Sequence, residues 1–202
     1  MKKLIILGAG GHGSVVADAA RKSGYSQIAF LDDANISSCL GYPVVGKIAD
    51  AGKYPGCVFF VALGNARTRQ AVSEELLSIG AELVNVIHPT AVIAAGVTLG
   101  KGVLLAAGSI VNPNVTIGNG VIINTAASVD HDCVVGEYCH ISVGARLAGN
   151  VRVEDHTWIG IGAVVSNGIS VCANCMIGAG ATVVKNLTES GTYVGTPARL
   201  MD

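Results

Sequence analysis

The chain has few charged residues and few aromatic side chains. Only 13% of its 202 residues are Asp, Glu, Lys or Arg, the net charge is -1, and 4% are aromatic. Proteins that bind nucleic acid are usually basic, so this balance argues against a nucleic-acid partner. The low charge, taken with the repeats described below, also indicates that part of the outer surface is buried in an oligomer.

Long apolar runs are also missing. No stretch approaches the roughly 18 apolar residues of a membrane-spanning helix, so no membrane span is expected. Met1–Lys3 is followed by a short apolar run, Leu4–Leu7, which is too brief for the core of a secretory signal. The cysteines do not form a disulfide framework, because Cys133, Cys139 and Cys175 occupy small inward positions of the repeat. Reduced thiols and a cytoplasmic location are therefore expected.

The sequence is rich in a six-residue repeat. From Ile93 to Val183 every sixth residue is aliphatic, sixteen times without a slip, and the residue two before it is small or aliphatic. This period fits neither a helix nor a simple alternating strand, and is typical of a hexapeptide β-helix. Residues two apart on a strand face the same side, so both apolar positions point inward. The Gly, Asn or Asp that often follows, as at Gly100 and Gly118, is expected to adopt unusual turn angles.

Residues 1–87 lack the six-residue repeat. Their pattern predicts strands that alternate with helices, as in a small parallel α/β sheet. Strands are expected at Lys3–Leu7, Ile28–Leu31, Val58–Leu63 and Leu83–Ile87, and helices at Ser14–Ser23 and Thr68–Ile79. The sequence therefore predicts two domains. A Rossmann-like α/β domain covers residues 1–87, and an all-β parallel β-helix of a little over five coils, with a C-terminal tail, covers residues 88–202.

A glycine-rich loop follows the first expected strand. Gly8, Gly10 and Gly13 match G-x-G-x-x-G, and Asp32 and Asp33 come about twenty residues later. In Rossmann units such glycines let backbone amides approach a diphosphate, and an acidic residue holds a hydroxyl of the ligand. The domain supplies only about half of a dinucleotide fold, which favours one nucleotide-like ligand over NAD. The alternative is that the glycines only make a tight turn.

Histidines mark the candidate chemistry of the repeats. His131 is expected at a turn beside Asp132, and a carboxylate can orient an imidazole and make it a better base. The alternative is an exposed pair without a role. The separations between His131, His140 and His156 are 9 and 16 residues. They do not match the three-histidine zinc sites of γ-class carbonic anhydrases, so no metal site is predicted.

Motifs spread along the whole chain carry a family resemblance. They are Gly8–Gly13 with His12, Phe30–Asp33, Ala62–Asn65, His88–Ala91, Asn124, Val129–Gly136, His140–Ala145, Leu147–Val151 and Gly195–Ala198. With them the chain resembles the NeuD/PglD-type sugar O- and N-acetyltransferases. It is most similar to the subgroup that forms UDP-N-acetylbacillosamine from a UDP-linked 4-amino-4,6-dideoxy sugar. The resemblance implies a left-handed β-helix, an exception to right-handed crossovers, and a homotrimer with acetyl-CoA between adjacent prisms.

The resemblance also implies roles for single residues. His131 would be the general base, and Asp132 would orient it. The nucleotide-linked amino sugar would be held by Gly10, Gly11, His12, Asp32, Asp33 and Gly64. Acetyl-CoA would be contacted by His140, Ile161 and Ala179, and the backbone amide of Gly149 would stabilise the oxyanion. The implied reaction is direct acetyl transfer to the sugar amine.

Two other functions stay open on the sequence alone. A sugar O-acetyltransferase of the sialic acid type would use the same fold and the same base, since a hydroxyl also loses a proton during attack. A non-catalytic β-helix binding module would require a displaced His131 or a blocked acetyl-CoA groove.

Overall fold

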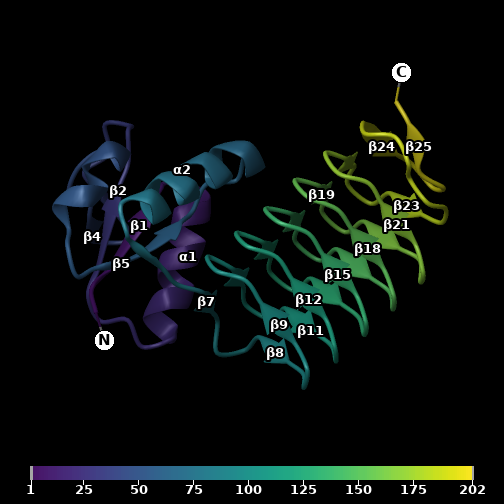
Figure 1. Ribbon diagram of the computed structural model, residues 1–202, viewed down its shortest axis with the longest axis horizontal. Coiled ribbons are helices and arrows are strands. Elements are labelled where there is room, and N and C mark those ends of the chain that lie inside the picture. Colours follow the sequence, from purple (N-terminus) through teal and green to yellow (C-terminus); the bar gives the residue numbers. More distant parts are fainter. Residues whose placement is uncertain (1, 202) are drawn as a thin grey trace.

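The computed structural model describes residues 2–201, which form an α/β domain beside a triangular solenoid (Figure 1). The α/β sheet is parallel with strand order β2-β1-β5-β6. Helix α1 packs on one face of this sheet, and α2 packs with the 3-10 helix η1 on the other. The elements are β1 Leu4–Leu7, α1 Gly11–Lys22, β2 Ile28–Leu31, β3 Ser38–Cys39, β4 Tyr42–Pro43, η1 Ile48–Lys53, β5 Val58–Val61, α2 Ala66–Ser78 and β6 Glu82–Leu83. Neither helix of the described chain approaches the length needed to cross a bilayer.

The element boundaries in the α/β domain agree with the sequence-based expectation to within two residues, with two exceptions. Helix α1 begins at Gly11 rather than Ser14, because the last glycines of the loop already form its first turn. The single strand expected over Leu83–Ile87 is two strands. Its second half, β7, pairs with β10 of the solenoid. The Asn85 side chain causes the break, since it bonds Gly100 O at 2.8 Å and Val103 N at 2.9 Å in the first coil.

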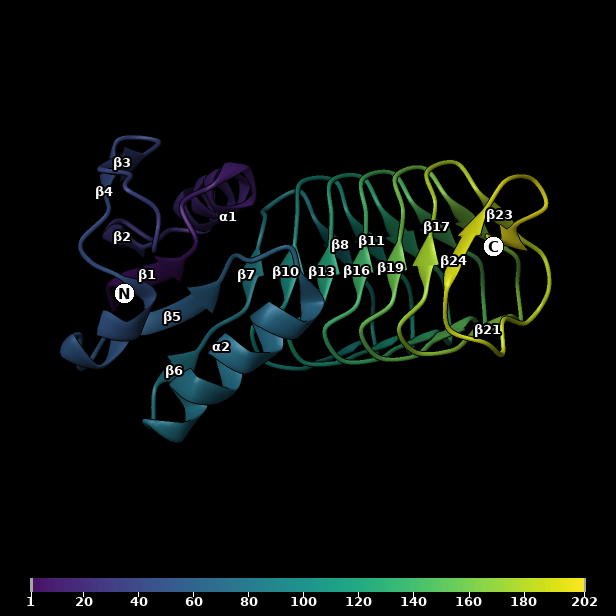
Figure 2. The ribbon, with the colours of Figure 1, turned by 90° about the horizontal axis from the view of Figure 1, so that it is seen from above.

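The solenoid winds left-handed through about six turns, as the family resemblance implied (Figure 2). Its short parallel strands form three faces. Face 1 holds β7 Val86–Ile87, β10 Leu104–Leu105, β13 Ile122–Ile123, β16 His140–Ile141, β19 Trp158–Ile159, β22 Met176–Ile177 and β24 Thr192–Val194, with β25 Arg199–Leu200 antiparallel at its end. Face 2 holds β8 Val92–Ile93, β11 Ile110–Val111, β14 Ser128–Val129, β17 Arg146–Leu147, β20 Val164–Val165 and β23 Thr182–Val183. Face 3 holds β9 Thr98–Leu99, β12 Thr116–Ile117, β15 Val134–Val135, β18 Arg152–Val153 and β21 Ser170–Val171.

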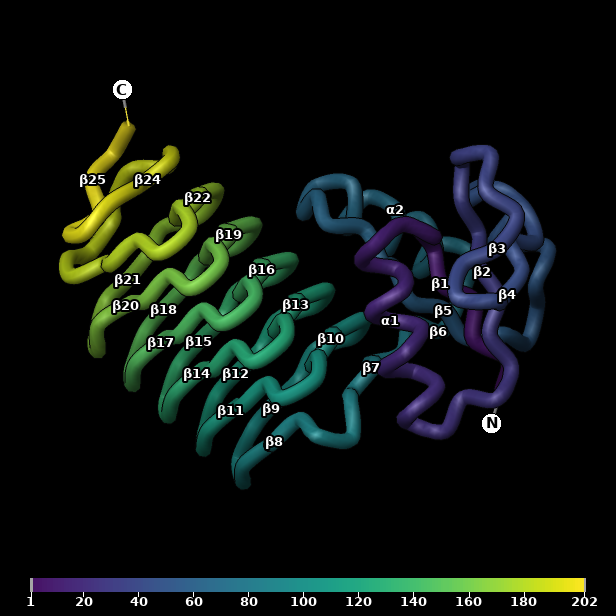
Figure 3. The backbone as a smooth tube through the Cα atoms, turned by 180° about the vertical axis from the view of Figure 1, so that it is seen from behind, coloured from purple at the N-terminus to yellow at the C-terminus, as the bar shows by residue number. Residues whose placement is uncertain are grey.

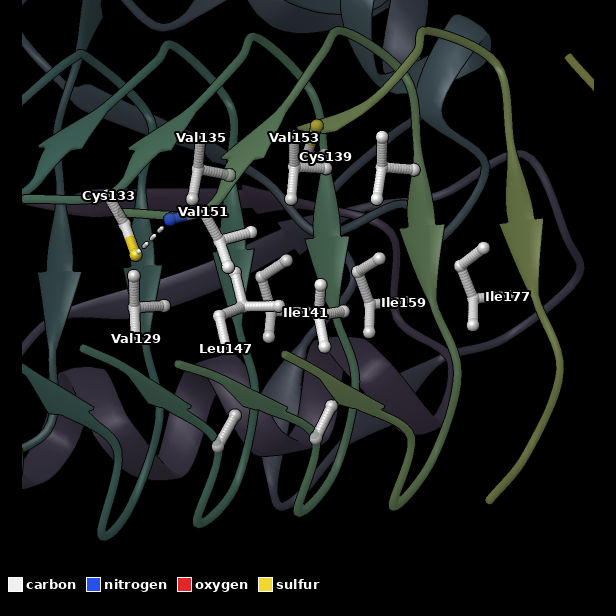
Figure 4. Packing of buried hydrophobic residues seen from close by; sticks show 14 of the residues in the cluster. Val129, Cys133, Val135, Cys139, Ile141, Leu147, Val151, Val153, Ile159 and Ile177 are labelled. Atoms are coloured by element: carbon white, nitrogen blue, oxygen red, sulfur yellow. Dashed lines mark hydrogen bonds between the residues drawn. The ribbon is translucent and has the colours of Figure 1, made fainter. Parts of the chain in front are cut away.

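The two inward positions of each hexad fill the solenoid core, as the period predicts (Figure 4). The aliphatic position is buried from Leu105 onward, whereas Ile93 is 40% exposed because no full coil precedes it. Cys133 and Cys139 lie buried at the small position as free thiols, and Val151 N donates to Cys133 Sγ at 3.3 Å. Sulfur therefore fills core volume here, and no disulfide forms between residues 2 and 201.

Each turn contains one residue in the left-handed region of backbone space, the third after the aliphatic residue. These are Gly96, Gly102, Gly108, Asn114, Gly120, Ala126, Asp132, Tyr138, Gly144, Asn150, His156, Gly162, Gly168, Asn174 and Gly180. The sequence-based expectation placed the unusual angles directly after the aliphatic residue, and this was wrong. Gly118 is a glycine for another reason, since a Cβ there would lie 2.8 Å from the Glu137 nitrogen of the next coil.

The α/β domain lies against the outer side of face 1, beside the early coils (Figure 3). The outward side chains of β10 and β13, Leu104 and Ile122, are buried in one cluster with Val16 of α1. Farther along face 1 the outward side chains emerge from this cover, and Trp158 is 39% exposed. The domain thus covers one face at one end of the prism and leaves the corner between faces 2 and 3 free.

We predict that Gly118→Ala lowers the melting temperature, because its Cβ would press on the backbone of the next coil. Overpacking of this kind costs about 1–3 kcal/mol. The matched control is Gly168→Asn, which has open space around it and follows Asn150 in the same column of left-handed residues. Thermal unfolding, followed by circular dichroism, gives the melting temperatures of both variants. Equal melting temperatures for Gly118→Ala and wild type would show that coil spacing does not exclude the methyl group.

Candidate active site

His131 lies at the corner between faces 2 and 3, with about half of its side chain exposed (52%). Its Nδ1 is 2.8 Å from Oδ2 of Asp132, so the ring proton sits on Nδ1 and the Nε2 lone pair is free. The hydrogen bond that His131 donates to Asp132 raises the pKa of His131, because the carboxylate stabilises the imidazolium.

Asp132 is itself held from the preceding coil. Asn114 lies eighteen residues earlier in the same column, and its Nδ2 donates to Asp132 Oδ1 at 3.0 Å. The hydrogen bonds from His131 and then from Asn114 lower the pKa of Asp132, which keeps it ionised. A parallel pair stands beside it, in which Asn112 Nδ2 donates to Asp130 at 2.7 Å. The carboxylate that orients His131 is thus fixed by the stacking of coils.

Gly149 lies beside this histidine in the following coil. A Cβ at Gly149 would come within 2.5 Å of His131 Nε2, so any larger residue would occupy the space at the free lone pair. Its backbone N–H makes no hydrogen bond within residues 2–201. The corner therefore offers a base and a free N–H donor side by side, which suits proton removal next to a developing oxyanion.

A second cluster lies between the α/β domain and face 1. The rings of His12 and His140 are 6.3 Å apart, and Trp158 stacks on His140 at 5.1 Å. Burial lowers the pKa of His12 to about 4 and that of His140 to about 3, and the positive charge of Arg69 adds to both effects. Both imidazoles are therefore neutral near pH 7 and act as hydrogen-bonding groups rather than as charges.

The tautomer of His140 follows from its neighbour. Asn124 Oδ1 accepts from Thr125 N, so the Asn124 amide turns its NH₂ toward His140 Nε2 at 3.0 Å. The ring proton is then on Nδ1, a buried donor without a partner in the described structure. An unsatisfied buried donor is costly, which indicates a hydrogen bond to a bound molecule.

The glycine loop forms the first turn of α1. The N–H groups of residues 11–13 have no partner within the helix, and no acidic side chain lies in this turn, so the end is suited to an anion. Asp32 supports the loop, accepting from Ala9 N at 2.6 Å, and Asp33 accepts from Ile48 N at 3.1 Å. Both carboxylates thus hold the loops around the sheet edge.

The predicted acetyl-CoA contacts Ile161 and Ala179 line one groove of about 220 Å³ at the corner between faces 1 and 2, which we call the corner groove. Trp158 and Met176 form one wall of it and also border a groove of about 490 Å³ beneath the start of α2, next to Gly64 and His140. The left-handed residues of this corner are all small: Gly108, Ala126, Gly144, Gly162 and Gly180. At the left-handed position this corner therefore carries no side chain larger than a methyl group, unlike the other two corners.

The structure brings the predicted residues together in two places, not one. His12, Gly64 and His140 meet at face 1, and Ile161 with Ala179 lies at its edge. His131, Asp132 and Gly149 lie at the corner opposite face 1. A single chain thus separates the candidate base from the candidate ligand grooves.

Three residues at these sites were missed in the sequence. Asn114 could have been found from the sequence, since it lies one eighteen-residue coil before Asp132. Trp158 could have been found in the same way, since it lies one eighteen-residue coil after His140 at the same outward strand position. Arg69, which is 1% exposed, is an ordinary helix residue in sequence, and only domain docking makes it special. Within residues 2–201, no group of three His, Cys, Asp or Glu residues is arranged to hold a metal ion.

Comparison with known proteins covers the whole chain. The family described as PglD N-terminal domain matches residues 3–76, and the hexapeptide repeat of succinyl-transferase matches residues 90–113 and 150–185. The acetyltransferase domain of PglB from Neisseria gonorrhoeae, in complex with acetyl coenzyme A, is 37% identical with a TM-score of 0.97 and covers 99% of both chains. PerB from Caulobacter crescentus, in complex with CoA and GDP-perosamine, is 38% identical with a TM-score of 0.95, covering 100% of this chain and 98% of that one.

A curated relative matches over a shorter stretch. The UDP-N-acetylbacillosamine N-acetyltransferase of Bacillus subtilis is 30% identical over 113 residues, which are 53% of this chain and 52% of the relative. The match thus spans about half the length of that protein.

We predict that Asp132→Asn lowers the pKa of His131, because the amide no longer stabilises the imidazolium. The measurement is a titration of the imidazole C2 proton by NMR, with the signal assigned by its loss in His131→Ala. The wild-type ring should hold its proton to higher pH than the ring of the variant. An unchanged or raised value in Asp132→Asn would show that the carboxylate does not act on this ring.

Proposed function

We propose that this chain, which belongs to the NeuD/PglD-type family of sugar acetyltransferases, transfers an acetyl group from acetyl-CoA to the amine of a nucleotide-linked 4-amino-4,6-dideoxy sugar. The observation that carries the proposal is the open corner at His131. There an oriented imidazole with a free Nε2 lies beside the unbonded N–H of Gly149. Proteins of 37% and 38% identity over the whole chain are described with acetyl coenzyme A and with CoA and GDP-perosamine.

The residues at this corner supply the proton transfer. The sugar amine attacks the thioester carbonyl, and His131 Nε2 accepts the proton that the amine loses. Asp132 holds the ring in the required tautomer and stabilises the imidazolium. The Gly149 N–H stabilises the negative oxygen, the C–S bond breaks, and the proton on His131 passes to the departing sulfur.

The corner groove is proposed as the donor site. The Gly and Ala residues in its left-handed column leave room for an extended ligand along the prism, and Ile161 and Ala179 line the groove. Trp158, which lines this groove, stacks on the ring of His140. The unpartnered Nδ1–H of His140 is suited to donate to the acetyl carbonyl. The α/β domain is proposed as the acceptor site, in which the amides of Gly10, Gly11 and His12 hold the diphosphate.

A homotrimer is proposed because one chain cannot assemble the site. His131 lies at the corner opposite face 1, whereas the donor and acceptor grooves border face 1. Placing the corner with His131 of one protomer against the corner groove of the next would bring the base to the donor. Cyclic symmetry repeats this heterologous contact until the ring closes.

We expect His131→Ala to lower kcat by about 10²–10⁴-fold, the usual contribution of a general base. The measurement is acetyl transfer to a nucleotide-linked amino sugar at saturating substrates. Melting temperature and oligomer mass should stay unchanged, because about half of the side chain is exposed and its one hydrogen bond within residues 2–201 is to Asp132. A variant with the wild-type rate would remove His131 from the reaction.

Subunit mixing tests the shared site with the same variant. The second chain is Ile161→Trp, in which the larger side chain fills the donor groove from an exposed position. Each variant alone should be inactive, and a random one-to-one mixture should regain about a quarter of the wild-type sites if base and groove come from adjacent protomers. No recovery in mixed oligomers would place base and groove in the same chain.

Asp33→Ala should raise KM for the sugar acceptor and leave KM for acetyl-CoA nearly unchanged. Asp33 holds the backbone of Ile48 at the edge of the acceptor site. Its other carboxylate oxygen is proposed to accept a hydrogen bond from the base or ribose of the acceptor, and loss of one hydrogen bond to a charged group corresponds to roughly tenfold or more in KM. Steady-state kinetics with each substrate varied in turn gives both constants. A rise in KM for acetyl-CoA alone would show that the α/β domain serves the donor.

A further inference from the structure

Arg69 of α2 is a buried cation between the two domains. Its side chain is 1% exposed, and no carboxylate within residues 2–201 forms a salt bridge with it. Burial lowers the pKa of its guanidinium to about 10, which still leaves it charged at neutral pH. A buried charge without a counterion is costly unless hydrogen bonds satisfy it, so its partners show what it is there to hold.

Every N–H of this guanidinium meets a backbone carbonyl. Nε donates to Gly120 O at 2.7 Å, and one terminal nitrogen donates to Leu63 O at 2.8 Å and Gly64 O at 2.9 Å. The other terminal nitrogen donates to Tyr138 O at 2.6 Å and Cys139 O at 3.5 Å. An arginine side chain has five N–H donors, and all are used. Arg69 therefore has no donor left for a ligand.

Four of the five carbonyls that it binds belong to two functional segments, and the fifth, Gly120 O, lies in an earlier coil of the solenoid. Leu63 and Gly64 form the loop after β5, which we call the acceptor loop because Gly64 lies at the proposed acceptor site. Tyr138 and Cys139 directly precede His140, which borders the larger groove together with Gly64 and stacks on Trp158, the wall that this groove shares with the corner groove. The same planar group thus holds the acceptor loop and the segment that leads to the wall between the two grooves.

We propose that Arg69 is a positioning residue that couples the two substrate sites, so that a molecule in the donor groove orders the acceptor loop through Tyr138, Cys139 and Arg69. The coupling rests on the proposed function, since it takes CoA as the occupant of the donor groove. Ordering of the β16 strand around His140 fixes the carbonyls of Tyr138 and Cys139. The planar guanidinium of Arg69 then restrains the carbonyls of Leu63 and Gly64 in the acceptor loop. A ligand that finds the loop already ordered loses less conformational entropy on binding.

Two other contacts of α2 with the solenoid do not link the acceptor loop to the residues before His140. Gln70 Oε1 meets His156 Nε2, and Arg67 donates to Asn174 Oδ1 at 2.7 Å. Gln70 joins the two domains but touches neither the acceptor loop nor the strand of His140. It therefore provides the matched control for domain docking without coupling.

Hydrogen exchange of the full-length protein with CoA as the probe tests the coupling. CoA should slow exchange in residues 158–164 and 176–182, which border the donor groove, and also in residues 62–70 on the other domain. The slowing in residues 62–70 should be about fivefold or more, the lower end of typical coupling between sites. Arg69→Lys keeps the charge but offers at most three donors, so it should lose protection of residues 62–70 and keep it at the groove. Gln70→Ala should retain both.

The outcomes separate the two proposals. Absence of protection at residues 158–164 and 176–182 in the wild type would contradict the donor site itself. Protection there without protection of residues 62–70 would overturn the coupling, even if Arg69→Lys does not fold, because the wild-type measurement needs no variant. Equal protection of residues 62–70 in Arg69→Lys and wild type would show that another contact carries it.

Discussion

Eighteen residues per coil is the constraint on which the structure depends. Residues eighteen apart lie above one another, so each corner of the prism carries a column of left-handed residues with a character of its own. The column between faces 1 and 2 holds only Gly and Ala. The column between faces 2 and 3 places Asn114 under Asp132, and the third column bears Tyr138, His156 and Asn174 beneath α2. One repeat thus provides a groove, a fixed carboxylate and a docking surface.

The core of this fold is readable from sequence because period six places the same two positions inward in every coil. The glycine loop was also predictable, since its spacing after a strand indicates a turn into a helix, although the helix begins at Gly11 rather than at the expected Ser14. The left-handed position was not, because Gly118 and Gly120 look alike in sequence. Gly118 is needed for close stacking of coils, and Gly120 for its backbone angle. The distinction appears only when one coil is placed on the next.

The candidate site was predicted in parts, and its arrangement was not. The pairing of His131 with Asp132 is local in sequence, and the structure shows the contact at 2.8 Å. His140 lies at an outward strand position, yet it is buried because the α/β domain and Trp158 cover it. Arg69 owes its position to contacts 51 to 70 residues away, which no local pattern reveals. Residues whose roles come from domain docking are therefore the ones that sequence reasoning misses.

The antiparallel strand β25 has a consequence for the order in which the protein comes apart. In a linear array each coil is stabilised only by its neighbours, and its ends unravel first. The α/β domain protects the first coils, so the far end is the vulnerable one, and there β25 folds back on β24 and stops further pairing. Ala179 lies nearest that end, then Ile161, and His140 comes later. Unfolding from this end would disrupt the corner groove before the cluster of His12 and His140 between the domains. The hairpin of β24 and β25 therefore stabilises the corner groove in particular.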